Sequence, residues 1–367
     1  MKRLLLTIIV LVPFVLFGQN RKGMNISSSV FYGNILRHRA SLAYQQPPYI
    51  YGVSLCFSQR TLGLKQWQYF HRYPEVGIGM AYFNLGDKDV LGEAVGILAQ
   101  ISYNMIETPK MAVNGEIAIG VGYVSKHFDS ITNPTNNAIG SSVNNMTVVK
   151  LNTSYRINRK LTLSGAIGIT HLSNGALKLP NLGINILEGI LGVKYHLNPV
   201  ISKDDFIVYD KSKNKANHKI GLQVQYNFGA KASENDGMLY DVTSTYLKGV
   251  FHYNKILKWQ FGFAYEFRND IYQHLIEQHV QNPKSAKMGA RRFMLMVAQE
   301  LVFDRLGLFG ETGVYLQKHS KNLEKPFYFK VGARYYLPIV PKLYIEGYIK
   351  THLFIGDHFA IGLGVEL

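Results

Sequence analysis

The sequence of 367 residues contains a single cysteine, Cys56, so no disulfide can form within the chain. Charged residues are scarce, at 17%, and no segment after residue 20 is apolar over the roughly 20 residues that a membrane-spanning helix needs. These absences exclude a disulfide-stapled domain and a bundle of membrane helices. Any membrane span has to be built from strands, and we expect Cys56 to pack as a small apolar residue.

Patterns that mark several enzyme and cofactor classes are also missing. The sequence has no Gly-x-Ser-x-Gly elbow, no His-Glu-x-x-His motif and no phosphate-binding glycine loop. Its histidines show no spacing typical of a metal site, and His274 and His279 fall in an expected loop, where a solvated role is favoured. We therefore expect neither a cofactor nor a bound metal.

The first feature that is present is a short apolar run near the start of the chain. Lys2 and Arg3 precede an apolar stretch from Leu4 to Phe17, which Gly18 follows. At about 14 residues the stretch is too short to span a membrane as a helix, and its basic start and small final residue are typical of a cleaved secretory signal peptide. We expect residues 1–18 to be removed, without lipidation because no cysteine follows; a retained anchor is the alternative.

Aromatic residues are abundant, at 13%, and they recur at every second position of several segments. From Leu257 to Arg268 the even positions are polar or small, whereas the odd positions are Leu257, Trp259, Phe261, Phe263, Tyr265 and Phe267. The same alternation occurs in residues 220–228, 327–335, 343–350 and 359–367. A period of two predicts strands with one apolar face and one polar face.

Strands of about ten residues with aromatic-rich apolar faces are typical of transmembrane barrels. We therefore predict an all-β fold in which residues 19–367 form one transmembrane antiparallel β-barrel of roughly 14 strands, within 12 to 16. Loops are expected at residues 132–145, 199–217, 271–287 and 318–325. A soluble β-sandwich and two separate small barrels are the alternatives, but one closed barrel leaves no exposed edge.

The balance of charge points to the same environment. The formal net charge of +16 becomes +14 once Lys2 and Arg3 leave with the signal peptide. No cluster of lysine and arginine interleaved with aromatics forms a surface for nucleic acid, so we expect no nucleic-acid partner. Attraction to an anionic, phosphate-bearing lipid surface explains the charge more simply. The sequence leaves the oligomeric state open.

One segment carries residues suited to catalysis. It reads Thr170-His171-Leu172-Ser173-Asn174-Gly175 and is followed by Pro180-Asn181-Leu182-Gly183. This combination resembles the outer-membrane lipid A 3-O-deacylases, the PagL family, also known as acyloxyacyl hydrolases. The resemblance extends loosely over residues 24–198, and the rest of the chain goes past the eight-stranded barrel of those enzymes. It implies a multi-pass protein of the cell outer membrane that removes an ester-linked acyl chain from lipid A, the membrane anchor of lipopolysaccharide.

The residues support this chemistry on their own. In the predicted strand from Leu161 to Ser173, His171 and Ser173 share the apolar side, which we expect to face lipid. Side chains two positions apart on a strand are close enough for a hydroxyl to meet an imidazole. A neutral imidazole is the general base that a serine nucleophile needs. A site on the outside of a barrel suits a substrate that arrives laterally through the membrane.

The third catalytic position departs from the family pattern. The family has a glutamate that orients the histidine, whereas the matching residue here is Asn185. Asparagine can hold the ring but adds no charge to stabilise imidazolium. By parity Glu188 points into the lumen, and only a bulge would bring it back. We expect Ser173 to be the nucleophile, His171 the base and then acid, Asn185 the orienting residue, and Asn174 part of an oxyanion hole.

Three functions from different classes remain open at this point. The catalytic segment favours a lipid A acyl hydrolase, whereas the length of the chain favours a pore or transporter with a wider lumen. Lumenal candidates such as Lys258, Glu266 and Arg334 fit either a pore or a plugged polar interior. Asn185 favours a third possibility, an inactive structural barrel in which His171 is an ordinary interfacial residue.

Overall fold

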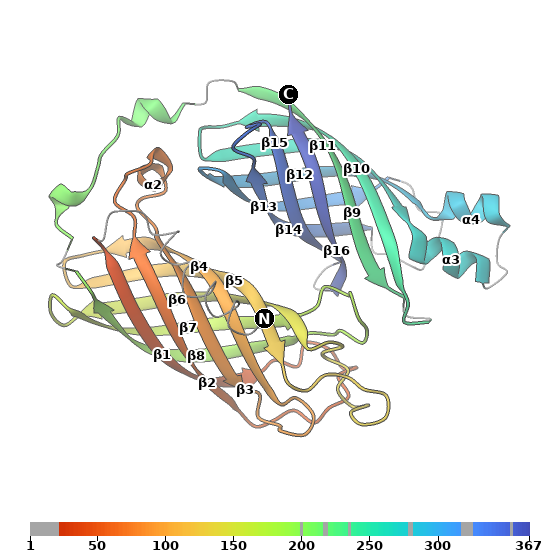
Figure 1. Ribbon diagram of the computed structural model, residues 1–367, viewed down its shortest axis with the longest axis horizontal. Helices are drawn as coiled ribbons and strands as arrows, with labels where there is room; N and C mark the ends of the chain where they lie inside the picture. Colours follow the sequence, from red (N-terminus) through yellow and green to blue (C-terminus); the bar gives the residue numbers. More distant parts are fainter. Residues whose placement is uncertain are drawn as a thin grey trace. The chain divides into compact units, whose positions relative to one another are not determined.

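The computed structural model describes residues 22–198, 201–215, 219–233, 236–277, 282–316, 326–352 and 355–367. Within these ranges the chain forms 16 strands, which close into two separate antiparallel barrels (Figure 1). The signal peptide expected at residues 1–18 and the loop expected at residues 318–325 lie outside the described residues.

The first barrel uses the N-terminal half of the chain. Its strands are β1 (Met24–Ile35), β2 (Ile50–Arg60), β3 (Glu75–Asn84), β4 (Glu93–Glu107), β5 (Met111–Val124), β6 (Val143–Arg156), β7 (Leu161–Ser173) and β8 (Ile184–His196). Each strand pairs with the next, and the barrel closes where β1 pairs with β8, with Ile35 opposite Ile186.

The second barrel repeats this plan in the C-terminal half. Its strands are β9 (Ile220–Ala232), β10 (Leu239–His252), β11 (Leu257–Arg268), β12 (Arg291–Phe303), β13 (Leu306–Tyr315), β14 (Phe327–Tyr336), β15 (Leu343–His352) and β16 (Ile355–Glu366). It closes between β9 and β16, with Val224 opposite Val365. The two barrels form separate compact units.

The all-β barrel class is therefore confirmed, but the prediction of a single barrel is wrong: the 16 described strands, at the upper limit of the predicted 12 to 16, are divided between two barrels, which the sequence left as the alternative. Alternating polarity fixes which face of a strand is apolar and does not say which strand it pairs with. Here β8 returns to pair with β1, so the first eight strands have no free edge before residue 199 is reached. The expected loop over residues 199–217 thus separates two barrels.

Short helices occupy some of the connections. They are α2 (Gln66–Phe70), η1 (Lys203–Asp205), η2 (Lys211–Asn214), α3 (Asn269–Glu277) and α4 (Pro283–Gly289). The loop expected at residues 271–287 is instead largely helical, because Ile271 and Leu275, one turn apart, bury against Ala286 of α4. None of the helices in the described ranges is long and apolar enough to cross a membrane.

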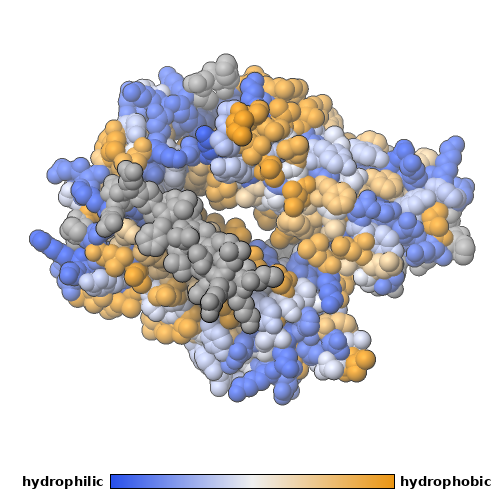
Figure 2. Space-filling model, viewed as in Figure 1, coloured by the Kyte–Doolittle hydropathy of each residue, from blue (hydrophilic) through white to orange (hydrophobic). Residues whose placement is uncertain are grey.

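The strands of both barrels place apolar side chains on the outside. In the first barrel the exposed positions include Val30, Leu55 and Ile167; in the second they include Phe228 and Phe263. Figure 2 shows hydrophobic areas on the outer surface that correspond to this pattern. A soluble sandwich would bury such residues between its sheets, so the outward apolar faces distinguish these barrels from that alternative.

The interior of the second barrel is filled by ion pairs. Lys350 Nζ lies 2.7 Å from Glu266, Arg334 contacts Glu300 at 2.9 Å and Glu346 at 2.8 Å, and all these side chains are buried. Burying charge in this way requires opposite partners and good hydrogen bonding, both of which the closed strands supply. The lumen of this barrel is therefore plugged by its own side chains.

At one end of the first barrel, four connections fold back over the strands. Three of them are residues 36–49, 85–92 and 125–142, whose apolar side chains, including Leu42, Leu85 and Ile139, join the buried core, and Leu182 of the fourth packs against it. Burial raises the pKa of Tyr44 to about 12, with Arg37 acting in the opposite sense. These connections pack around the adjacent strand ends, including the end of β7 and the start of β8, and hold them in place.

Candidate functional site

The candidate site lies where β7 ends and β8 begins, on the outside of the first barrel. The two strands pair with His171 opposite Asn185, and Ser173 is the last residue of β7. Since residues at odd positions of β7 face outward, His171 and Ser173 share one side, as the sequence predicts. Register and parity together therefore place three polar side chains at one point on the outer surface.

The three side chains form a continuous hydrogen-bonded chain. His171 Nε2 lies 2.9 Å from Ser173 Oγ, and His171 Nδ1 lies 2.6 Å from Asn185 Oδ1. An amide oxygen only accepts, so Nδ1 must carry the proton and donate it to Asn185. The other ring nitrogen is then unprotonated and accepts the Ser173 hydroxyl, which is the arrangement that general-base activation of serine requires.

Burial separates the three residues from bulk water. Ser173 is only 8% exposed, and His171 and Asn185 are partly buried. One step further along the same two strands, Ile169 and Leu187 are 47% and 42% exposed and continue the outward apolar face. The polar site thus borders directly on an apolar surface, which suits a substrate with a polar ester and an apolar chain.

Asn174, the residue expected to contribute to an oxyanion hole, follows Ser173 directly. Its side chain is buried, and its Nδ2 donates a hydrogen bond to Ser141 Oγ at 3.0 Å. Ser141 belongs to the connection between β5 and β6. This bond fixes Asn174 beside Ser173 and links it to a second connection.

Sequence reasoning missed two outward polar residues on β6. Asn145 pairs with Ser173 and Thr147 pairs with His171, so both lie beside the site. Thr147 Oγ1 donates to Asn145 Oδ1 at 2.8 Å, and Asn145 Nδ2 donates to the carbonyl of Gly120 at 3.3 Å. The parity of β6 could have revealed them, but the expected loop over residues 132–145 hid the start of that strand at Val143.

Glu188 does not take the place of the missing family glutamate. Its side chain is buried in the lumen, where Thr170 Oγ1 donates to Oε1 at 2.7 Å. Strands β7 and β8 pair in one unbroken register from Leu161 to Leu172, so no bulge turns Glu188 toward His171. Asn185 is therefore the residue that contacts the imidazole Nδ1.

The connection after β7 is held against two others by a backbone hydrogen bond and by the imidazole of His38. Gly183 N donates to the carbonyl of Ala138 at 2.9 Å, and His38 Nε2 lies 3.0 Å from the carbonyl of Leu182. Gly183 has φ +81°, and a Cβ built on it would lie 3.0 Å from His171 Cε1. The glycine of the Pro-Asn-x-Gly motif is thus needed both for its backbone conformation and for the space it leaves to the histidine ring.

In the part of the chain that the structure describes, no group of three or more histidine, cysteine, aspartate or glutamate side chains is placed to hold a metal ion.

Comparison with known families gives one match for each barrel. The model of a family described as lipid A 3-O-deacylase (PagL) matches residues 52–194, and that of the acyloxyacyl hydrolase C-terminal domain (PagL_C) matches residues 220–367. The first match lies within the region that the sequence motif implies. The second covers strands that the motif resemblance did not reach. A search of curated proteins finds no match.

Solved structures of outer-membrane proteins also resemble the chain. The Neisserial surface protein A (NspA) is 12% identical, with a TM-score of 0.32, and the match covers 48% of this chain and 98% of that one. The outer-membrane enzyme PagL is 17% identical, with a TM-score of 0.31, and the match covers 46% of this chain and 97% of that one.

Proposed function

This chain belongs to the lipid A 3-O-deacylase (PagL) family, and we propose that it is an outer-membrane enzyme that hydrolyses an ester-linked acyl chain of lipid A. The observation that carries the proposal is the hydrogen-bonded chain from Ser173 through His171 to Asn185 on the outer, apolar surface of the first barrel. A hydrolase for soluble esters would not need its nucleophile on that surface.

The proposed reaction has two steps with one covalent intermediate. His171 Nε2 takes the proton of Ser173 as Oγ attacks the ester carbonyl carbon, and the resulting imidazolium donates it to the departing sugar oxygen. The acyl chain is then bound to Ser173. A water molecule that gives its proton to His171 attacks the acyl carbonyl, and the fatty acid leaves as Ser173 regains its proton.

Asn185 and Asn174 have supporting roles in this mechanism. Through its 2.6 Å contact with Nδ1, Asn185 keeps the reactive nitrogen of His171 turned toward Ser173. The backbone N–H groups near Asn174 would stabilise the negative oxygen of the tetrahedral intermediate. The side-chain amide of Asn174 donates one hydrogen bond to Ser141, which holds the residue in place beside Ser173.

The proposed orientation places the site in the outer leaflet. Outer-membrane barrels have short turns on the periplasmic side and longer connections outside. In the first barrel the end opposite the site has two short turns, at residues 108–110 and 157–160, and one longer connection, 61–74, whereas the site end has only connections longer than these turns, including 36–49 and 125–142. Ser173 would therefore meet lipid A in the leaflet where that lipid resides.

Mass spectrometry of lipid A tests this proposal. Cells that express the chain should contain lipid A lighter by one acyl chain, together with the free fatty acid, and fragmentation should identify the position cleaved. The family description points to the 3-O position. Unchanged lipid A, with the protein folded in the outer membrane, would contradict the proposal; ion conductance in planar bilayers would then favour a pore.

Gly183 provides a test of how the histidine is positioned. We expect Gly183→Ala to lower turnover by about 10²-fold, because the new Cβ strains a positive-φ position and displaces a ring on which reaction geometry depends. Gly189→Ala on β8 is the matched control, since the nearest atom to its Cβ would be 3.9 Å away. Equal turnover of both variants would show that the glycine does not position His171.

A further inference from the structure

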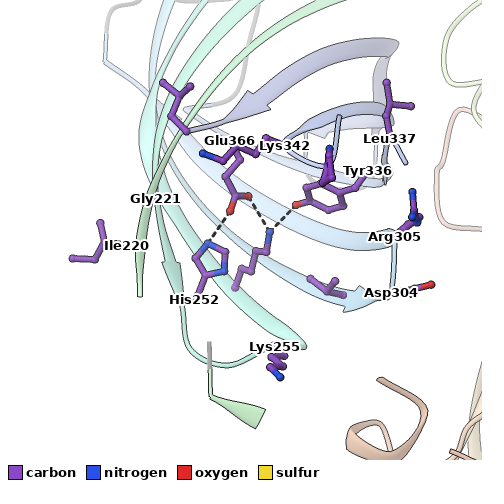
Figure 3. A pocket seen from close by; sticks show the side chains of 14 residues that line it. Ile220, Gly221, His252, Lys255, Asp304, Arg305, Tyr336, Leu337, Lys342 and Glu366 are labelled. Atoms are coloured by element: carbon purple, nitrogen blue, oxygen red, sulfur yellow. Dashed lines mark hydrogen bonds and ion pairs between the residues drawn. The ribbon is translucent and has the colours of Figure 1, made fainter. Parts of the chain in front are cut away.

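The second barrel contains a cavity that the proposed deacylation does not use. It has a volume of about 820 Å³ and lies at the mouth of the barrel where β9 begins and β16 ends (Figure 3). Its walls come from the strand ends and from the turns at residues 253–256, 304–305 and 337–342. Cavities of 300 to about 1,000 Å³ are typical of sites for small molecules.

The floor of the cavity is a closed network of polar side chains. Glu366 accepts from His252 at 2.8 Å, from Lys258 at 2.9 Å and from Gln223 at 2.8 Å, as the dashed lines in Figure 3 show in part. Tyr336 accepts from Lys258 at 2.9 Å and donates to Glu300 at 2.8 Å. Below this layer Arg334 bridges Glu300 and Glu346, so the cavity ends blindly and is not the entrance of a channel.

The charge on the walls is predominantly positive. Lys255, Lys258, Arg305 and Lys342 line the cavity, against the carboxylates of Asp304 and Glu366. Lys258 pairs with Glu366 in the floor, so the other basic side chains of the lining, Lys255, Arg305 and Lys342, lie at the rim, where they come from three different turns and stand against Asp304. A concave surface lined by one sign of charge concentrates ions of the opposite sign.

Two hydrogen bonds organise this rim. Tyr336 N donates to the carbonyl of Arg305 at 2.8 Å, which joins two of the turns. Lys255 N donates to the carbonyl of Asn214 at 3.1 Å, which brings η2, with Lys211 and Lys213, next to the third turn.

From these observations we propose that the cavity binds a sugar-sized solute that carries a phosphate or carboxylate group. The basic rim, to which Lys255, Arg305 and Lys342 contribute at separate places, would attract the anion, while Tyr336, Leu337 and Pro341 offer an apolar wall to a ring. The proposal is independent of deacylation, because no residue of the first barrel enters it. The turns at this mouth are short, as the periplasmic turns of outer-membrane barrels are.

Calorimetric titration of the full-length protein in detergent micelles tests the proposal. Glucose 6-phosphate and glucuronate distinguish phosphate from carboxylate as the preferred anion, and glucose is the neutral probe. We expect saturable binding of at least one of the two anions, and no binding of glucose. Glucose binding as tightly as either anion, or no binding by any probe, would overturn the proposal.

Charge reversal at the rim provides the matched comparison. Arg305→Glu combined with Lys342→Glu should weaken anion binding at least tenfold and leave lipid A hydrolysis unchanged. The control, Lys284→Glu combined with Lys287→Glu on the exposed face of α4, changes net charge equally and should bind as wild type does. Equal weakening in both double variants would show that only the overall charge attracts the anion.

Discussion

Ser173→Ala should lose at least about 10²-fold in the turnover of lipid A, while the barrel folds as before. In serine proteases, removing the nucleophile lowers turnover by about 10⁶-fold, and replacing the aspartate of the triad by asparagine lowers it by about 10⁴-fold. In this chain His171 contacts both Ser173 and Asn185, so the Ser173–His171 pair should still contribute at least about 10²-fold to turnover, which Ser173→Ala removes. The measurement is the rate of fatty acid release from lipid A in mixed micelles.

Two further variants make that result specific. His171→Ala, alone or combined with Ser173→Ala, should lower turnover as much as Ser173→Ala alone, because the effects of substitutions in residues that act as one unit are not additive. Ser28→Ala, at an exposed serine on β1 of the same barrel, should keep full activity. Unchanged turnover in Ser173→Ala would remove the covalent mechanism and return His171 to an interfacial role.

Asn185→Asp should raise turnover, by up to about 10⁴-fold. Aspartate has the size of asparagine and can keep its oxygen 2.6 Å from His171 Nδ1, where its charge would stabilise the imidazolium formed during attack. The low-pH limb of the rate profile should also move to higher pH, because a nearby carboxylate favours the protonated imidazole. Asn185→Glu restores the residue of the family but must fit one more methylene.

The control for this gain is Asn145→Asp, which adds the same charge next to Ser173 but away from Nδ1. Its turnover should not rise. Asn185→Ala, which removes the contact that orients His171, should be slower than wild type. If Asn185→Asp and Asn145→Asp were equally fast, the third member would not act through His171, and the site would work in another way.

The barrel class and the proximity of His171 to Ser173 could be predicted from the sequence because both depend on parity. Alternation along residues 257–268 fixed the outward face of that strand, and alternation along β7 put His171 and Ser173 together. Pairing of His171 with Asn185 needed only the next strand in the chain. Such local relations survive folding, because a strand keeps its two faces whatever it pairs with.

The closure of the barrels could not be predicted in the same way. The pairing of Ile35 with Ile186 joins residues that are distant in the chain, and the residue pattern of neither strand indicates which strand it pairs with. The helices α3 and α4 were missed because each is short, and a few apolar positions such as Ile271 and Leu275 show little helical periodicity. The position of Asn145 beside Ser173 depends on strand register, and the cavity beside Lys342 depends on the conformation of turns. Alternation along a strand predicts neither.

The outward position of Ser173 also determines which concentration governs the proposed enzyme. A substrate that stays in the leaflet reaches the site by diffusion in two dimensions, so the rate follows the mole fraction of lipid A in the membrane and not its amount per volume. Adding inert lipid or detergent at constant lipid A would slow the enzyme by dilution within the surface. The released fatty acid enters the same apolar layer that borders Ile169 and Leu187, where it can compete with the next substrate molecule.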